Sequence, residues 1–155
     1  MALYAALASR DITLQGVTTV FGNVPVKQAT RNIVRLLRLA PHAPSVAIGE
    51  GSDQPLTGSR LPRRFLHGRD GLGDLGIPVV AALSSGLKST PLILDRLRTG
   101  ALDEIVALGP LTNVAHAYAA APRLLRQLRG ITVMAGVMVD RAEARTTEFN
   151  LASDP

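Results

Sequence analysis

Residues 105–120, IVALGPLTNVAHAYAA, decide the fold that the sequence predicts. The apolar run at 105–108 has the length of a buried strand, and a turn at 109–113 ends it. The chain then continues as a helix through Ala120. A short apolar strand that turns directly into a helix is the building unit of a parallel α/β sheet.

The same alternation of strands and helices extends in both directions from this segment. Short clusters of β-branched or apolar residues indicate strands, and apolar residues at three- and four-residue spacing indicate helices. Strands are predicted at 12–20, 45–48, 105–108 and 131–134. Helices are predicted at 1–8, 25–40, 89–100 and 124–128, and from the turn at 109–113 through 120. We therefore expect an α/β fold with a mostly parallel sheet and flanking helices, in one domain over residues 1–155.

Two predicted helices carry further information. The helix over 25–40 is amphipathic, and its basic residues lie off the apolar face: Lys27, Arg31, Arg35 and Arg38. The helix over 1–8 begins at Met1 with no Ser, Thr, Asp or Asn ahead of it to cap its first turn. Such an opening is typical of the second half of a longer helix.

Composition excludes several classes of protein. The 155 residues are 46% hydrophobic and 19% charged, which supports a buried core, and the absence of cysteine excludes disulfides, thiolate metal sites and thiol nucleophiles. Aromatic residues make up only 3%, too few for a base-stacking surface. No apolar run approaches the ~20 residues of a membrane span, and the first residues do not resemble a signal peptide. The default expectation is a cytoplasmic protein.

The charge balance is basic without being concentrated. Lysine and arginine number 17 against 12 acidic residues, a net charge of +5, and the pI is about 10.7. The arginines are scattered, and no stretch holds five consecutive basic residues. A solvated basic surface is favoured over a nucleic-acid interface.

Residues 49–77 form the longest predicted loop and include the glycine-rich run HGRDGLG at 67–73. A loop of this length is usually functional or mobile, and we expect His67 and its loop to be mobile without ligand. The spacing G-x-G-x-x-G at 71–76 does not indicate a dinucleotide site, because Pro78 follows it where a helix would have to begin.

Polar residues follow three of the predicted strands. Asn23 follows the first, Thr112 and Asn113 follow the strand at 105–108, and the segment 146–150 follows the last. Taken singly, each residue is most simply a turn or cap residue. However, the carboxyl ends of parallel strands share one edge of the sheet, where ligands collect. Amides with one carboxylate form a set suited to sugar hydroxyls.

These segments resemble the nucleoside hydrolases, and within them the inosine-uridine preferring group. The resemblance rests on GVTTVFGNV at 16–24, HGRDGLG at 67–73, LGPLTNVA at 108–115, and EFN at 148–150 followed by Asp154-Pro155. These blocks occur in the order and approximate spacing of the family, and they extend over the whole chain. The resemblance implies a Rossmann-like nucleoside hydrolase fold.

The resemblance also implies an activity: calcium-assisted hydrolysis of the N-glycosidic bond of ribonucleosides, giving ribose and a free base in purine and pyrimidine nucleoside catabolism. It places one calcium ligand on the backbone carbonyl of Thr112 and a base-proximal histidine at His67. It implies that the ribose is held by Asn23, Met134, Glu148 and Asn150. From the alternation of an extended segment, we expect Glu148 and Asn150 to face the cleft while Phe149 packs inward. Homo-oligomers are expected for full-length members of the family.

Several features of the family are missing from this sequence. The aspartate cluster D-x-D-x-G-x-D-D, with the general base and most calcium ligands, is expected upstream of Met1, and a block with the catalytic histidine is expected downstream of Pro155. A Gly-Asn pair that the family carries before EFN is replaced by RAEAR at 141–145. We therefore expect an interior segment of a nucleoside hydrolase that is catalytically silent alone. The strand absent from its start belongs between 12–20 and 105–108, so we expect open strand edges there.

Two other functions stay open on the sequence. The chain could be a non-catalytic remnant that binds ribose or nucleosides, or a small basic α/β protein associated with RNA. The few aromatic residues and the scattered arginines argue against the RNA hypothesis. We expect a nucleoside partner, with neither nucleic acid nor membrane.

Overall fold

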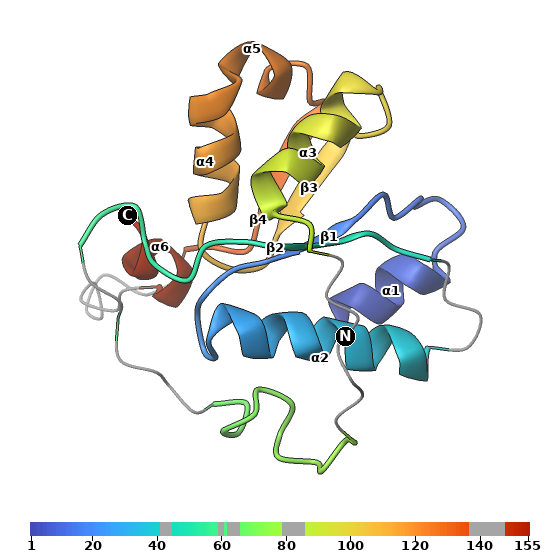
Figure 1. Ribbon diagram of the computed structural model, residues 1–155, viewed down its shortest axis with the longest axis vertical. Helices are drawn as coiled ribbons and strands as arrows, with labels where there is room; N and C mark the ends of the chain where they lie inside the picture. The colour runs from blue at the N-terminus through green and yellow to red at the C-terminus, as the bar shows by residue number, and fades with distance from the viewer. Residues whose placement is uncertain (41–44, 59–60, 62–65, 79–85, 137–147) are drawn as a thin grey trace.

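A computed structural model of the protein describes residues 1–40, 45–58, 61, 66–78, 86–136 and 148–155 (Figure 1). The elements in chain order are α1 (Ala2–Ala8), β1 (Val17–Thr19), α2 (Val26–Leu39), β2 (Ile48–Glu50), α3 (Ser89–Arg98), β3 (Glu104–Ala107), α4 (Thr112–Ala120), α5 (Pro122–Leu125), β4 (Gly130–Val133) and α6 (Phe149–Ser153). Short strands alternate with helices, so the predicted α/β class is confirmed. None of the helices in this described part is long and apolar enough to cross a membrane.

The strands form two parallel pairs. β1 pairs with β2, with Val17 opposite Ile48, and β3 pairs with β4, with Ile105 opposite Ile131. Among the described residues, no pairing joins β1 to β3. Both pairs are parallel, as the strand–helix alternation predicts.

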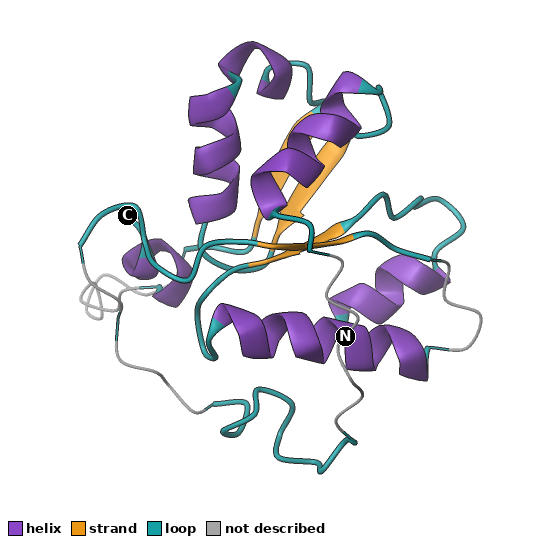
Figure 2. Ribbon diagram, in the orientation of Figure 1, coloured by secondary structure: helices purple, strands orange, loops and turns teal. Residues whose placement is uncertain are grey.

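Helix α3 holds the two strand pairs together. Its residues Ile93, Leu94 and Leu97 form a buried core with α4 and α5, against which Ile105 of β3 packs. Leu92, one position earlier, lies against the backbone at Gly16 and Gly49, next to β1 and in β2. Figure 2 shows α3 and α4 together on one face of the β3–β4 pair. Each buried leucine or isoleucine contributes about 1.5–3 kcal/mol to folding, so α3 is the main apolar contact of the fold.

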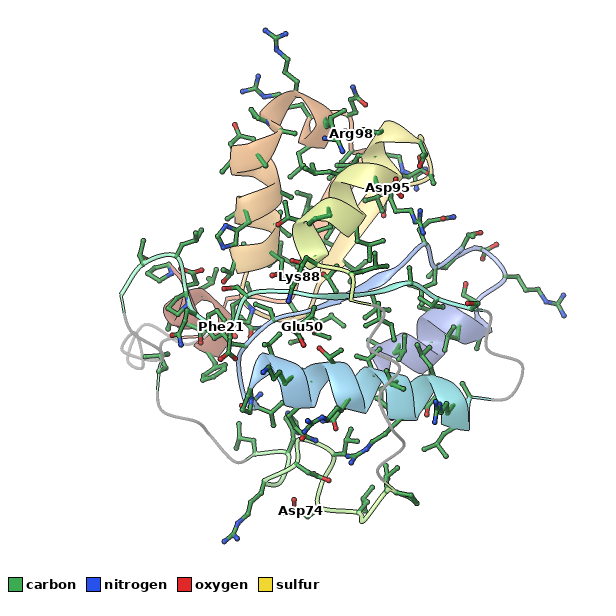
Figure 3. All side chains as sticks on the ribbon, viewed as in Figure 1. Phe21, Glu50, Asp74, Lys88, Asp95 and Arg98 are labelled. Atoms are coloured by element: carbon green, nitrogen blue, oxygen red, sulfur yellow. The ribbon has the colours of Figure 1, made fainter. Side chains whose placement is uncertain are left out.

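The start of α3 is also joined to β2 by a charged contact. Lys88 Nζ donates to Glu50 Oε1 at 3.2 Å, and the two side chains point toward each other in Figure 3. The backbone amide of Glu50 donates to the carbonyl of Leu87 at 2.9 Å. The ion pair is largely exposed, so its net contribution is about 0–1 kcal/mol. The backbone contact therefore does more to set where α3 begins.

Helix α2 packs on β1 and β2, and the residues that it buries differ from those predicted. Thr30 Oγ1 and Thr19 Oγ1 are 2.8 Å apart and buried, which joins α2 to β1. Arg35, predicted to lie off the buried face, is only 7% exposed, and its Nη1 donates to Asn32 Oδ1 at 3.4 Å. Asp70, in the following loop, lies close enough to Arg35 for the guanidinium to act on its carboxylate. The 66–78 loop packs on the side of α2 that carries Asn32. The spacing of apolar residues in α2 does not predict that a loop covers this polar side.

The strands are shorter and less buried than predicted. Residues 12–16 are not strand, and Ile12 is exposed. β3 was predicted to be buried, yet Val106 is 61% exposed. The cause is that α3, α4 and α5 cover only the face that carries Ile105. The predicted helix at 124–128 ends at Leu125 in α5.

The described residues around His67 are held by hydrogen bonds of the loop's own backbone and side chains, contrary to the expectation of a mobile loop. Asp74 Oδ1 accepts the amides of Arg69 and Asp70, and Asp70 Oδ1 accepts the amides of Leu72 and Asp74. These last two amides lower the pKa of Asp70. Asn32 Nδ2 of α2 donates to the Asp70 carbonyl at 2.7 Å and fixes the loop to the helix.

Candidate functional site

The side chain of Asn113 links the end of β1, the loop after β2 and the start of α4, which follows β3. It is buried at the start of α4, directly after β3. Its Nδ2 donates to the Thr19 carbonyl at the end of β1 (2.8 Å), and its Oδ1 accepts the amide of Ser52 after β2 (3.0 Å). A Cβ atom at Gly51 would collide with this amide group and with the Thr19 carbonyl, so glycine is required there. Asn113 thus builds the shared edge that the sequence predicted, as a structural link.

The segment with Glu148 and Asn150 is a helix, not an extended strand. The Glu148 carboxylate caps α6: it accepts the amides of Asn150 and Leu151, each at 2.9 Å. Asn150 Nδ2 donates to the carbonyls of Met134 (3.0 Å) and Leu108 (3.5 Å) at the ends of β4 and β3. Because residues 148–150 are not extended, the predicted alternation of their side chains between two faces is wrong. Glu148, Phe149 and Asn150 are all half-buried. The capping bonds still leave both carboxylate oxygens with further acceptor capacity.

Asp154, just after α6, contacts two distant parts of the chain. Its Oδ1 accepts the amides of Leu56 (3.0 Å) and Thr57 (3.3 Å), and its Oδ2 accepts Thr112 Oγ1 (2.5 Å). Burial raises the pKa of this carboxyl, but the hydrogen bonds from Thr112, Leu56 and Thr57, together with the charge of His116, outweigh burial and hold the pKa below its usual value. Asp154 is therefore an ionised link between α6, α4 and the loop after β2.

This link predicts a loss of stability in acid. Because the pKa of Asp154 is lower in the folded chain than in the unfolded chain, its contribution is present above the unfolded pKa of about 4 and is lost as pH falls through the folded pKa. We expect Asp154→Asn to be less stable than wild type at pH 7, with a difference that shrinks toward zero below about pH 3. Urea unfolding from pH 7 to pH 2.5 measures this. Asp103→Asn, an exposed carboxylate with the same charge change, is the control, and a difference for Asp154→Asn that is constant with pH would contradict the link.

Of the other predicted site residues, Met134 adjoins the cluster through Asn150, whereas Asn23 and His67 do not; the cluster consists of Thr112, Asn113, Glu148, Asn150 and Asp154. Asn23 follows β1, and its Oδ1 is buried without a hydrogen-bond partner in the described structure, so the carbonyl oxygen can still accept. Met134 is 54% exposed next to Asn150. His67 is exposed on the 66–78 loop, and Figure 1 shows this loop beyond α2, well away from α6. No described contact joins His67 or Asn23 to the cluster. The RAEAR stretch at 141–145 and His42 lie outside the described residues.

The described residues do not by themselves fit a calcium ion. Calcium takes six to eight oxygen ligands, usually with several carboxylates. Near Thr112 the carboxylate present is that of Asp154, which already accepts three donors. Across the described ranges, no group of three or more His, Cys, Asp or Glu residues could hold a metal. The Thr112 carbonyl could supply at most one ligand of such a site.

Two residues, one of the cluster and one beside it, were not singled out as links in the sequence. Asp154 appears there only as part of the Asp-Pro ending of the last block, and His116 is not singled out there. The structure brings His116 close enough to Asp154 to act on its carboxylate. No local sequence pattern indicates Asp154, because the partners of its carboxylate lie 42, 97 and 98 residues away.

A sequence profile described as "Inosine-uridine preferring nucleoside hydrolase" matches residues 1–155. The chain belongs to this family of nucleoside hydrolases.

Individual relatives agree with this assignment. The chain is 36% identical to "Uridine nucleosidase 1" of Arabidopsis thaliana, over 100% of this chain and 47% of the relative. It is 29% identical to "Non-specific ribonucleoside hydrolase RihC" of Escherichia coli (strain SE11), over 100% of this chain and 51% of the relative. The solved structure "Inosine-Guanosine Nucleoside Hydrolase (IG-NH)" superimposes with a TM-score of 0.86 at 32% identity, over 99% of this chain and 49% of that one. The chain thus spans about half the length of the relatives it matches.

Proposed function

We propose that this chain supplies ribose-binding residues of a ribonucleoside hydrolase, which cleaves the N-glycosidic bond with water to give ribose and a free base. The observation that carries the proposal is the placement of Glu148 and Asn150. One short helix presents both where β3 and β4 end, and Asn150 is bonded there to the Met134 carbonyl. The names of the relatives, uridine nucleosidase and ribonucleoside hydrolase, support the same reaction class.

The available atoms suit a ribose. The Glu148 carboxylate and the Asn150 side-chain oxygen can accept hydrogen bonds from sugar hydroxyl groups, and the exposed Met134 side chain offers an apolar surface beside them. Cleavage of a glycosidic bond builds positive charge on the sugar ring, which a nearby carboxylate stabilises. Asn23, with its unpaired buried oxygen, is the fourth proposed contact, and His67 is proposed to lie near the base.

We further propose that the complete protein uses calcium, with the Thr112 carbonyl as one ligand. Most ligands would then come from residues outside the described part of this chain, and the 155-residue chain alone should not turn over nucleosides. We also propose that residues 1–155 form part of a single domain. The protein is proposed to be cytoplasmic, and its full-length form to be a homo-oligomer.

Ribose binding by the chain tests the proposal. We expect D-ribose to shift the NMR signals of the Asn150 side-chain amide and the Met134 methyl group, and to leave the methyl groups of Leu97 in the α3 core unchanged. Asn150→Ala should abolish the shift at Met134, while Gln127→Ala, outside the cluster, should preserve it. Ribose-induced shifts that avoid α6 and the end of β4 would place any sugar site elsewhere and contradict the proposal.

A further inference from the structure

Helix α6 is too short to hold its own orientation. It has five residues, and a helix of this length has few internal hydrogen bonds against the cost of forming its first turn. Its placement therefore depends on contacts outside it. At its start, Asn150 is bonded to the Met134 carbonyl. At its end, Asp154 is bonded to other segments of the chain.

The hydrogen-bond donors to Asp154 come from two other segments, the loop after β2 and the start of α4. Leu56 and Thr57 are 98 and 97 residues away in sequence, in the loop after β2, and Thr112 is 42 residues away at the start of α4. Thr112 is only 1% exposed, so its hydroxyl could not donate to water instead if the Asp154 carboxylate were removed. The donors converge on one carboxylate, which fixes the end of α6 against both segments.

We propose that Asp154 is a positioning residue of the site: through Thr112 and the loop at 56–57, it fixes α6 so that Glu148 and Asn150 stand at the ends of β3 and β4. Asp154 has no contact with the substrate in this role. The inference rests on the proposed function, because it gives the reason why α6 must be held in place. It goes further, because it assigns a role to a residue outside the proposed ribose contacts.

The ligand-free 155-residue chain allows a direct test by NMR. Asp154→Asn keeps the shape of the side chain but replaces one acceptor oxygen with an NH2 group that faces donors. We expect hydrogen exchange at Leu56 and Thr57 to become at least about tenfold faster, and the Asn150 side-chain amide signals to move toward their positions in the unfolded chain.

Asp53→Asn is the matched control. Asp53 lies in the same loop and also accepts a backbone amide, that of Val26 at 3.0 Å, but this contact serves the start of α2. The control should leave the Asn150 signals in place. Unchanged Asn150 signals in Asp154→Asn, or an equal shift in Asp53→Asn, would overturn the proposal.

A second variant covers the case in which Asp154→Asn does not fold. Thr112→Val removes only the hydroxyl that donates to Asp154 and keeps the side-chain volume. It should move the Asn150 signals while exchange at Leu56 and Thr57 stays close to that of wild type. Asn150 signals at their wild-type positions in Thr112→Val would overturn the positioning role.

Ribose titration separates this inference from the proposed function. A wild-type chain that shows no response to ribose contradicts ribose binding, while the ligand-free spectra still decide the role of Asp154. Where ribose binds, Asp154→Asn should raise its Kd at least about tenfold and Asp53→Asn less than about twofold. Equal ribose affinity in wild type and Asp154→Asn would refute the positioning role.

Discussion

Replacing Asn113 with alanine is expected to lower the free energy of unfolding by about 3–5 kcal/mol, because it removes the side-chain partner of a buried carbonyl and of a partly buried amide. The Ser52 amide loses its acceptor, and the Thr19 carbonyl loses the donor that it receives from α4. Each unsatisfied buried group costs about 1–3 kcal/mol, and the cavity left by the amide adds to this.

The measurement is urea unfolding of the 155-residue chain, followed by circular dichroism. Tyr118→Phe, at an exposed position of the same helix, is the control and should change stability by less than about 0.5 kcal/mol. Asn113→Asp should also be destabilised, since it keeps an acceptor for Ser52 but loses the donor to Thr19. An Asn113→Ala chain as stable as the control would show that the strand ends are held together without this side chain.

The second large effect is expected at Glu148, in an active protein. We consider a chimera in which residues 1–155 replace the matching half of Arabidopsis thaliana uridine nucleosidase 1. In it, Glu148→Gln should lower kcat/KM for uridine by about 100-fold or more, because the variant loses the negative charge beside the developing positive charge of the sugar. Stability should fall by only about 1 kcal/mol, because the amide oxygen of glutamine can still accept one of the two capping amides.

Glu104→Gln is the matched control for this variant. Glu104 lies at the start of β3 and forms an exposed pair with Arg129 at 2.8 Å, away from α6. The same change in charge at this position should alter kcat/KM less than about twofold. If Glu148→Gln were as active as Glu104→Gln, Glu148 would have no place among the ribose contacts.

The predicted elements that are confirmed are those set by neighbouring residues. The turn after 105–108 and the helix through Ala120 follow from Gly109, Pro110 and a run of alanines, all close in sequence. Gly100 ends α3 as expected, with a φ of +68° that glycine adopts easily. Local propensity and turn chemistry are sufficient for such features.

The features that sequence reasoning missed depend on distant partners. Asn113 bonds to Thr19 across 94 residues, and no local pattern distinguishes this amide from an ordinary helix-start residue. Arg35 is buried on a helix that binds the 66–78 loop through Asn32 and the Asp70 carbonyl, 38 residues apart in sequence. The segment around Glu148 and Asn150 is predicted to be extended, whereas the Glu148 carboxylate begins a helix by capping it. Links of this kind appear only once the chain is folded.

The central claim is that this chain contributes ribose contacts to a nucleoside hydrolase but not a complete catalytic site. The most direct test is to incubate the purified 155-residue chain with inosine or uridine and millimolar calcium and to measure ribose release, with the chimera as the positive control. We predict release by the chimera and none by the chain alone. Calcium-dependent release by the chain alone would contradict this account, because the 155 residues would then supply a metal site and a general base by themselves, whereas no group of side chains in the described ranges could hold a metal.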